Sequence, residues 1–95
     1  MILIDPPTWP GWGRTWSHLV SDDSIEELHG FAERLGIPPK LFDEDHYDVP
    51  VERYDEVVAA GASEVSGTEL IRRLIASGLR ISAAERRGGR SPGRG

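Results

Sequence analysis

The sequence predicts an α/β fold: one small domain in which a short, mostly parallel or mixed sheet is covered by about three helices. Short apolar segments with strand-like alternation are interleaved with longer segments of helical periodicity, which is typical of α/β proteins. Two Ser-x-x-Glu patterns precede helical segments, and Gly or Pro stands where elements should end. The 95 residues are enough for one hydrophobic core, which we expect to span residues 1–79.

The start of the chain predicts two strands joined by a loop. Residues 2–5 form a short apolar run that ends before two prolines, which indicates a buried strand. Residues 6–14 are rich in Pro, Gly and Trp, have no periodicity, and predict a loop. Residues 15–21 alternate as a strand does, with Ser17 and Leu19 on one face and Trp16, His18 and Val20 on the other.

Three helices follow, each with start and stop signals. Ser24 and Glu27 form a capping-box pattern, and Gly36 ends this first helix. The second helix has Pro50 in its first turn and stops at Gly61. The third begins after a second capping-box pattern, ends at Gly78, and carries an apolar stripe of four residues: Leu70, Ile71, Leu74 and Ile75.

Two further segments complete the predicted sheet. Residues 43–50 are acidic with β-leaning residues in the middle, and they predict a short edge strand or an extended loop. Residues 63–65 predict a short strand between the second and third helices. Because strands alternate with helices, we expect part of the sheet to be parallel.

Charge is distributed unevenly along the chain. The net charge is −5, but residues 80–95 hold five arginines against one glutamate, so the preceding 79 residues carry −9. An acidic globule repels phosphate backbones, so we do not expect its folded part to bind nucleic acid. The Gly/Arg-rich tail, residues 80–95, is predicted to be disordered and to be either a solvated terminus or a weak contact for an acidic partner.

The composition excludes several other classes of protein. The chain has no cysteine, so it has no disulfide, thiolate zinc site or cysteine nucleophile. We find no apolar run long enough to cross a membrane and no secretory signal, and we therefore expect a cytoplasmic protein. The P-loop, dinucleotide-binding, zincin, EF-hand and nucleophile-elbow motifs are all missing.

Candidate chemistry rests on histidine and aspartate. If residues 43–50 are extended, His46 and Asp48 project from one face, where they can bind a divalent metal ion or act as an oriented general base. The alternative is a solvated acidic loop with a structural hydrogen bond. His18 is either a satisfied core histidine or part of a cleft. Asp5 ends the first strand, where ligand crevices are common, but it can equally bind the amides of the following turn.

Four candidates converge in one polar pocket if their strands are neighbours: Asp5, His18, His46 and Asp48. We expect all four as ligands of a divalent metal ion, with the two histidines and Asp48 as the catalytic groups, acting on or binding a phosphate-containing or other anionic small molecule. A separation of His18 and His46 above about 10 Å would exclude this pocket, because metal–nitrogen bonds are about 2 Å long. His29 is predicted to be structural, with a carboxylate such as Asp5 or Asp48 as its partner.

The Trp-rich segment is a separate candidate. Trp9, Arg14 and Trp16, together with Trp12, can stack a base or another aromatic ligand, or pack on a partner protein. Alternatively, the indoles close over a modest core where the strands are short. Exposure of all three indoles would favour the binding surface.

Several segments of the sequence also resemble those of a known family. The segments "ILIDPP", "WSHLVSD", "EELHGFAERLGIP", "FDEDHYDVP" and "VVAAGA" resemble small bacterial and phage proteins grouped as Domain of Unknown Function 4031. The resemblance runs from Ile2 to Leu79 and leaves the basic tail outside. It implies a compact stand-alone domain and transfers no activity, ligand or residue role to this chain.

Two functional alternatives follow from these observations. One is an enzyme-like site with the His/Asp pocket at its centre and a divalent metal ion as its cofactor. The other is a non-catalytic binding or accessory module that uses the Trp-rich segment and the Arg-rich tail for a protein partner, while the histidines serve structure. We take the His/Asp pocket as the preferred interpretation and the accessory module as the alternative, and the sequence does not decide whether the protein is an enzyme.

Overall fold

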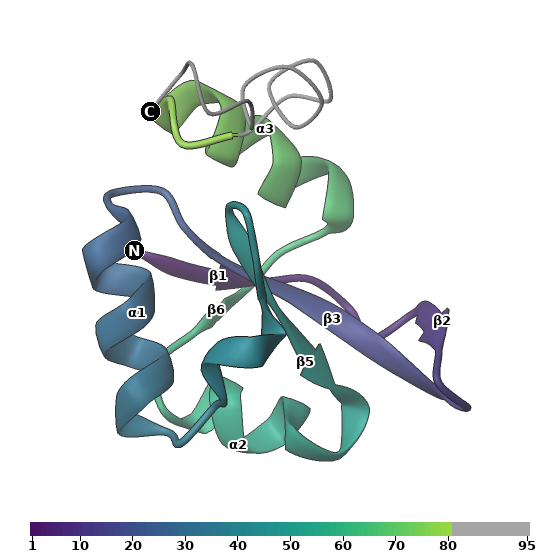
Figure 1. The fold of residues 1–95 in the computed structure, drawn as a ribbon. Helices are drawn as coiled ribbons and strands as arrows, with labels where there is room; N and C mark the ends of the chain where they lie inside the picture. The colour runs from purple at the N-terminus through teal and green to yellow at the C-terminus, as the bar shows by residue number, and fades with distance from the viewer. Residues whose placement is uncertain (81–95) are drawn as a thin grey trace, which may run out of the picture.

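A computed structural model describes residues 1–80, which form a mixed sheet between two layers of helices (Figure 1). The strands follow the order β4 (Phe42–Asp43), β5 (His46–Pro50), β3 (Arg14–Ser21), β1 (Ile2–Ile4) and β6 (Ser63–Glu64). Strand β2 (Trp9–Gly11) pairs with β3 outside this path. Among these residues β1 and β6 form the one parallel pair, so the sheet is mixed but not mostly parallel. The reason is that β2–β3 and β4–β5 are hairpins, which need no helical crossover.

The helices cover the two faces of the sheet unequally. Helices α1 (Ile25–Arg34) and α2 (Tyr54–Ala59) lie on one face, and α3 (Gly67–Ser77) lies on the other (Figure 1). Alternation along the strands explains this division, because successive side chains point to opposite faces. Leu19 packs with α1 and α2, whereas Val20 packs with α3. Two short 3₁₀ turns, Pro39–Leu41 and Val51–Arg53, connect the remaining elements.

The helix boundaries follow the predicted signals. The hydroxyl of Ser24 accepts a hydrogen bond from the backbone N–H of Glu27, and Ser66 makes the equivalent bond at the start of α3. Gly36 and Gly78 have positive φ angles of 69° and 82°, as expected of residues that end helices in the left-handed conformation. The local signals therefore account for where α1 and α3 begin and end.

Several predicted elements differ from the structure. Residues 6–14 contain strand β2, because Trp12 and Gly13 both have positive φ and close a two-residue hairpin turn. Residues 43–50 contain parts of two strands, and β5 lies between β4 and β3 instead of at the edge. Pro50 ends β5 and precedes the first turn of the following helical segment. Ile75 is exposed although it belongs to the predicted apolar stripe of α3, because the sheet contacts a narrower face of this helix.

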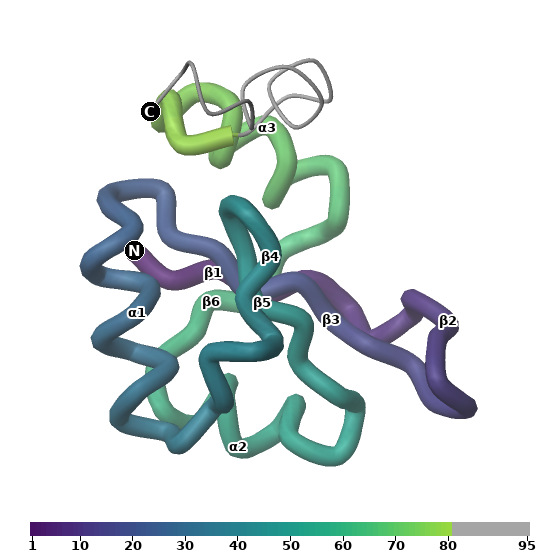
Figure 2. Tube along the Cα trace, in the orientation of Figure 1, coloured from purple at the N-terminus to yellow at the C-terminus, as the bar shows by residue number. Residues whose placement is uncertain are grey.

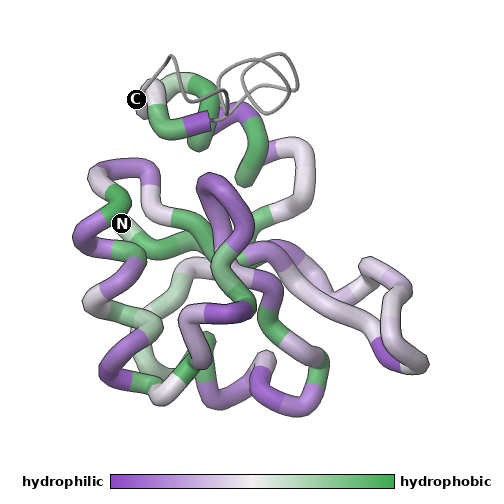
Figure 3. The backbone as a smooth tube through the Cα atoms, viewed as in Figure 1, coloured by the Kyte–Doolittle hydropathy of each residue, from purple (hydrophilic) through white to green (hydrophobic). Residues whose placement is uncertain are grey.

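Hydropathy follows the layers of the fold. In Figure 3 strand β1 and the inner end of β3 are hydrophobic, whereas the tip of the β4–β5 hairpin is hydrophilic. None of the helices formed by residues 1–80 has the length and apolar character needed to cross a membrane. The tail that we predicted to be disordered falls outside the described residues, except for Arg80.

Candidate functional site

A hollow of about 560 Å³ opens on the α3 face of the sheet. Its apolar wall comes from α3, through Leu70 and Leu74, and its polar floor comes from β3 and β5. Helix α3 packs on Leu3 of β1 and Val20 of β3, and the hollow lies beside this contact, between α3 and the polar residues of β3 and β5. The Cα trace shows this arrangement, with α3 above the crossing strands and the β2–β3 hairpin extending away from it (Figure 2).

The first imidazole of the hollow, His18, is fixed by an aspartate. Asp5 follows β1 directly, and its backbone N–H donates to the carbonyl of His18. Its Oδ1 accepts from the backbone N–H of His18 at 2.6 Å, and its Oδ2 lies 2.7 Å from Nδ1 of the ring. Both side chains are largely buried. The two contacts fix the ring orientation and leave Nε2 for a ligand in the hollow.

The second imidazole, His46, lies between two carboxylates. Its Nδ1 is 2.8 Å from Oδ1 of the fully buried Asp45, and its Nε2 is 3.2 Å from Oδ1 of Asp48. Burial disfavours the charged ring, but the hydrogen bonds to Asp45 and Asp48 outweigh it and raise the pKa of His46 to about 9. His46 is therefore protonated at neutral pH in the metal-free protein and donates to both carboxylates. The guanidinium of Arg80 forms a long ion pair with Asp45, with Nη1 3.8 Å from Oδ2.

The pairing of β3 with β5 brings these groups together. His18 lies directly opposite Asp48 in the antiparallel register, and the rings of His18 and His46 are 5.1 Å apart between centroids. One potential ligand atom from each of His18, His46 and Asp48 lies within 4.8 Å of the other two. All four predicted residues line the same hollow, with Asp5 holding His18 in place. The four predicted residues therefore lie together, and the two imidazoles are well within the 10 Å limit. The prediction that Asp5 is itself a metal ligand is not supported, because both of its carboxylate oxygens contact His18 and it is not part of the three-residue ligand group.

The donor set is suited to a transition metal ion. Two imidazole nitrogens and one carboxylate oxygen are typical ligands of catalytic zinc and related ions, and three protein ligands leave a coordination position open. Ligand atoms on one ion with bonds of about 2.1 Å lie roughly 3–4 Å apart. The Asp48–His46 pair already has this spacing, and the ligand atom of His18 lies within 4.8 Å of both. Asp43 also lines the hollow and adds negative charge.

The three tryptophans lie at the hollow and not over the core. Trp9 contacts His18 edge to face, with ring centroids 4.4 Å apart, and Trp16 donates from Nε1 to the carbonyl of Gly11 at 2.8 Å. Trp9 is 52% exposed and Trp12 is 91% exposed, whereas Trp16 is half-buried. The expectation that the indoles close over the core is wrong for Trp9 and Trp12, because the β2–β3 hairpin carries them away from it. The criterion of three exposed indoles is met by these two and not by Trp16.

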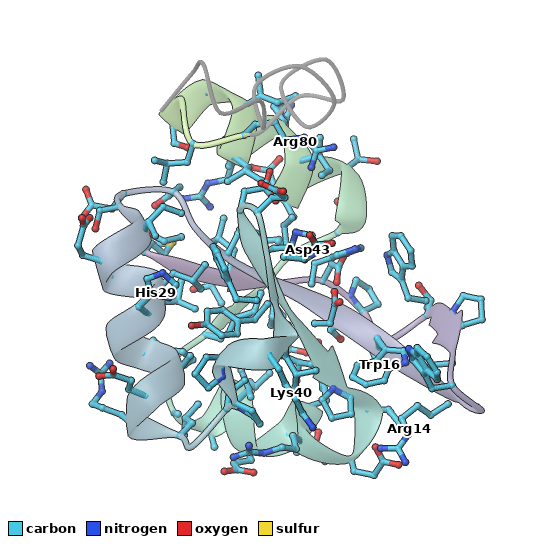
Figure 4. All side chains as sticks on the ribbon, viewed as in Figure 1. Arg14, Trp16, His29, Lys40, Asp43 and Arg80 are labelled. Atoms are coloured by element: carbon cyan, nitrogen blue, oxygen red, sulfur yellow. The ribbon has the colours of Figure 1, made fainter. Side chains whose placement is uncertain are left out.

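Arg14 is placed differently from the tryptophans. Its guanidinium lies 5.9 Å from the centroid of the Trp16 ring and forms an ion pair with Glu52 at 3.3 Å. Arg14 is not among the described residues that line the hollow. In Figure 4, Arg14 and Trp16 lie together near the projecting hairpin, while Asp43 and Arg80 lie toward α3. A direct contact between Arg14 and a ligand in the hollow remains a prediction without support from its position.

His29 is a residue of α1, which covers the opposite face of the sheet (Figure 4). Its Nδ1 is 2.7 Å from the hydroxyl of the buried Tyr47, and its ring contacts Phe42. The predicted carboxylate partner, Asp5 or Asp48, is wrong, because Tyr47 alternates with His46 and Asp48 along β5 and points to the other face. The chain thus contains a histidine with a satisfied hydrogen bond outside the hollow.

Sequence reasoning missed the role of Asp45. This residue belongs to an acidic run that favours a solvated loop, yet it is fully buried. The cause is the tight turn between β4 and β5, in which Glu44 has a positive φ of 65° and the chain directs Asp45 inward. The one available signal was its position directly before the candidate ligand His46. The contribution of α3 to the hollow, through Gly67 and Leu70, had no local signal because it depends on tertiary packing.

Comparison with known proteins gives one match. A family model described as "Protein of unknown function (DUF4031)" matches residues 2–77 of the 95-residue chain. No curated protein and no solved structure matches the chain. The matched range includes β1, β3 and β5, and therefore every candidate ligand in the hollow. The chain belongs to the DUF4031 family.

Proposed function

We propose that the hollow is a divalent-metal site that binds an anionic small molecule through the ion. Nε2 of His18, Nε2 of His46 and the Asp48 carboxylate are the ligands in this proposal. The observation that carries it is the convergence of these three groups, each imidazole being held through Nδ1 by a buried carboxylate. A carboxylate that accepts from the other ring nitrogen of a metal-binding histidine orients the ring and raises its basicity.

The donor set also indicates which ions and which chemistry to test. Nitrogen-containing sites favour Zn²⁺ and neighbouring transition ions, whereas Mg²⁺ prefers oxygen ligands alone. A bound ion polarises a phosphoryl or carbonyl oxygen and lowers the pKa of a bound water to about 7. Hydrolysis of a phosphate ester is therefore the reaction class that this site supports best.

Calorimetric titration of the full chain with Zn²⁺ tests the proposal. We expect one ion per chain for the wild type, and at least a tenfold weaker affinity for His18→Gln and His46→Gln, because each variant removes a ligand. The matched control is His29→Gln, which removes the third histidine but leaves the hollow untouched. The proposal would be contradicted if His18→Gln and His46→Gln bound Zn²⁺ as tightly as His29→Gln, or if the wild type did not bind Zn²⁺.

The accessory module is the second candidate, and the exposure of Trp9 and Trp12 favours it. Under this alternative the histidines are structural and the hairpin contacts a protein partner. The melting temperature separates the two functions. If the hollow is a metal site, Zn²⁺ binds the folded state and raises the melting temperature by mass action. If the protein is an accessory module, Zn²⁺, Mn²⁺ and Mg²⁺ leave the melting temperature unchanged.

A further inference from the structure

We infer that the ligand of this hollow is a mononucleotide, whose phosphate binds the metal ion while its base stacks on the tryptophans. This inference rests on the proposed metal site and adds the class of ligand. The structural reason is that the aromatic and metal-ligating groups are in contact: the Trp9 ring meets the His18 ring at a centroid distance of 4.4 Å. A ligand that reaches the ion through one end therefore lies within reach of the indoles through the other.

The aromatic half of the site consists of every tryptophan in the chain. Trp9, Trp12 and Trp16 all line the hollow, and the sequence has three tryptophans in total. Trp9 and Trp12 expose large ring surfaces, which is unfavourable unless a partner covers them. Stacking of a base on an aromatic side chain contributes about ten- to a hundredfold in affinity and tolerates different bases.

The anionic half of the ligand depends on the ion. Three carboxylates line the hollow, from Asp5, Asp43 and Asp48. Without a metal ion they outnumber its two cations, Arg80 and the protonated ring of His46, and they repel a free phosphate. Within residues 1–80, Arg80 is the only arginine or lysine that lines it. A bound divalent ion offsets this negative charge, and a phosphate oxygen can then coordinate the ion directly. Phosphate binding is therefore expected only when the metal ion is present.

Size and charge favour a single nucleotide over a nucleic acid. The hollow of about 560 Å³ lies within the range of small-molecule sites, and Leu70 and Leu74 offer an apolar wall beside the indoles. Residues 1–79 carry a net charge of −9, and Asp5, Asp43 and Asp48 in the hollow account for only part of it, so the surface outside the hollow is also acidic and repels the further phosphates of a polymer. A mononucleotide places one phosphate at the ion and none on this acidic surface.

Tryptophan fluorescence measures this binding directly, because all three indoles report on the hollow. The full chain, first titrated with Zn²⁺ alone and then held at saturating Zn²⁺, is titrated with adenosine 5′-monophosphate, adenosine, ribose 5-phosphate and inorganic phosphate. We expect the monophosphate nucleotide to bind at least tenfold more tightly than each of the other three. Without Zn²⁺, we expect its affinity to fall at least tenfold. Equal affinities for the nucleotide and ribose 5-phosphate would overturn the inference.

Variants and a polymer separate the remaining outcomes. Trp9→Ala is measured at a Zn²⁺ concentration that saturates this variant. We expect its affinity for the nucleotide to fall about tenfold and its affinity for ribose 5-phosphate to change little. Trp9→Phe should restore most of the lost nucleotide affinity. His29→Gln is the control outside the hollow. An oligonucleotide that binds as tightly as the monophosphate would overturn the preference for a single nucleotide. If the protein binds Zn²⁺ but binds nucleotide no more tightly than ribose 5-phosphate, only this inference is overturned. If the protein does not bind Zn²⁺, the proposed function is overturned as well.

Discussion

Asp5→Asn is expected to weaken Zn²⁺ binding by about ten- to a hundredfold while the protein stays folded. In the wild type, Oδ1 of Asp5 accepts from the backbone N–H of His18, and Oδ2 faces Nδ1 of the ring. An asparagine oxygen keeps the first contact, so its amide N–H₂ must face Nδ1. That nitrogen then accepts a hydrogen bond, the ring proton moves to Nε2, and Nε2 no longer has a lone pair for a metal ion.

Asp5→Ala separates this effect on binding from an effect on folding. Alanine removes both contacts and leaves the backbone N–H of His18 without its acceptor, so we expect a loss of about 2–4 kcal/mol in the free energy of unfolding. Asp5→Asn should lose much less, because it keeps the backbone contact. Urea unfolding and calorimetric Zn²⁺ titration of both variants make the comparison. Wild-type Zn²⁺ affinity in a folded Asp5→Asn variant would show that Asp5 does not orient a ligand.

Alkaline pH is expected to destabilise the metal-free protein through His46. Its pKa is raised from 6.5 to about 9 in the folded state, so folding favours the protonated ring. This contribution is fully present below the unfolded pKa of 6.5 and is lost as the pH rises through 9. The shift corresponds to at most about 3 kcal/mol. Urea unfolding in the presence of a chelator, at steps from pH 6 to 9.5, measures it.

His46→Gln is the control for this pH dependence. The N-terminal ammonium of Met1 titrates in a neighbouring range, since its hydrogen bond to Glu27 raises its pKa, but it is present in both proteins. The difference in stability between wild type and His46→Gln should therefore shrink as the pH rises. A difference that stays constant from pH 6 to 9.5 would mean that His46 is not held as a cation between Asp45 and Asp48.

Local sequence patterns predicted most of the elements but fewer of their neighbours. The caps at Ser24 and Ser66 depend on contacts within one turn of helix, and period-two alternation placed His18 and Val20 on one face, so both were predictable. The β2–β3 hairpin was not, because its turn uses Trp12 with a positive φ in place of the usual Asn or Gly. Strand order likewise depends on packing between distant segments.

The candidate site was likewise predictable only in part. His46 and Asp48 share a face by strand geometry alone, and their approach to His18 required only that β3 and β5 be neighbours. The burial of Asp45 and the pairing of His29 with Tyr47 were not predictable, because each depends on which face of the sheet a turn or helix meets. Site residues marked by strand alternation or by a strand end were found, whereas the burial of Asp45 and the partner of His29, which depend on tertiary contacts, were missed.

A crystal structure of the full chain soaked with Zn²⁺, with anomalous scattering recorded at the zinc edge, tests the metal site most directly. We expect one anomalous peak in the hollow, about 2.0–2.2 Å from Nε2 of His18, Nε2 of His46 and a carboxylate oxygen of Asp48. A hollow without a peak, or zinc bound only at other side chains while His46 keeps its contacts with Asp45 and Asp48, would contradict it.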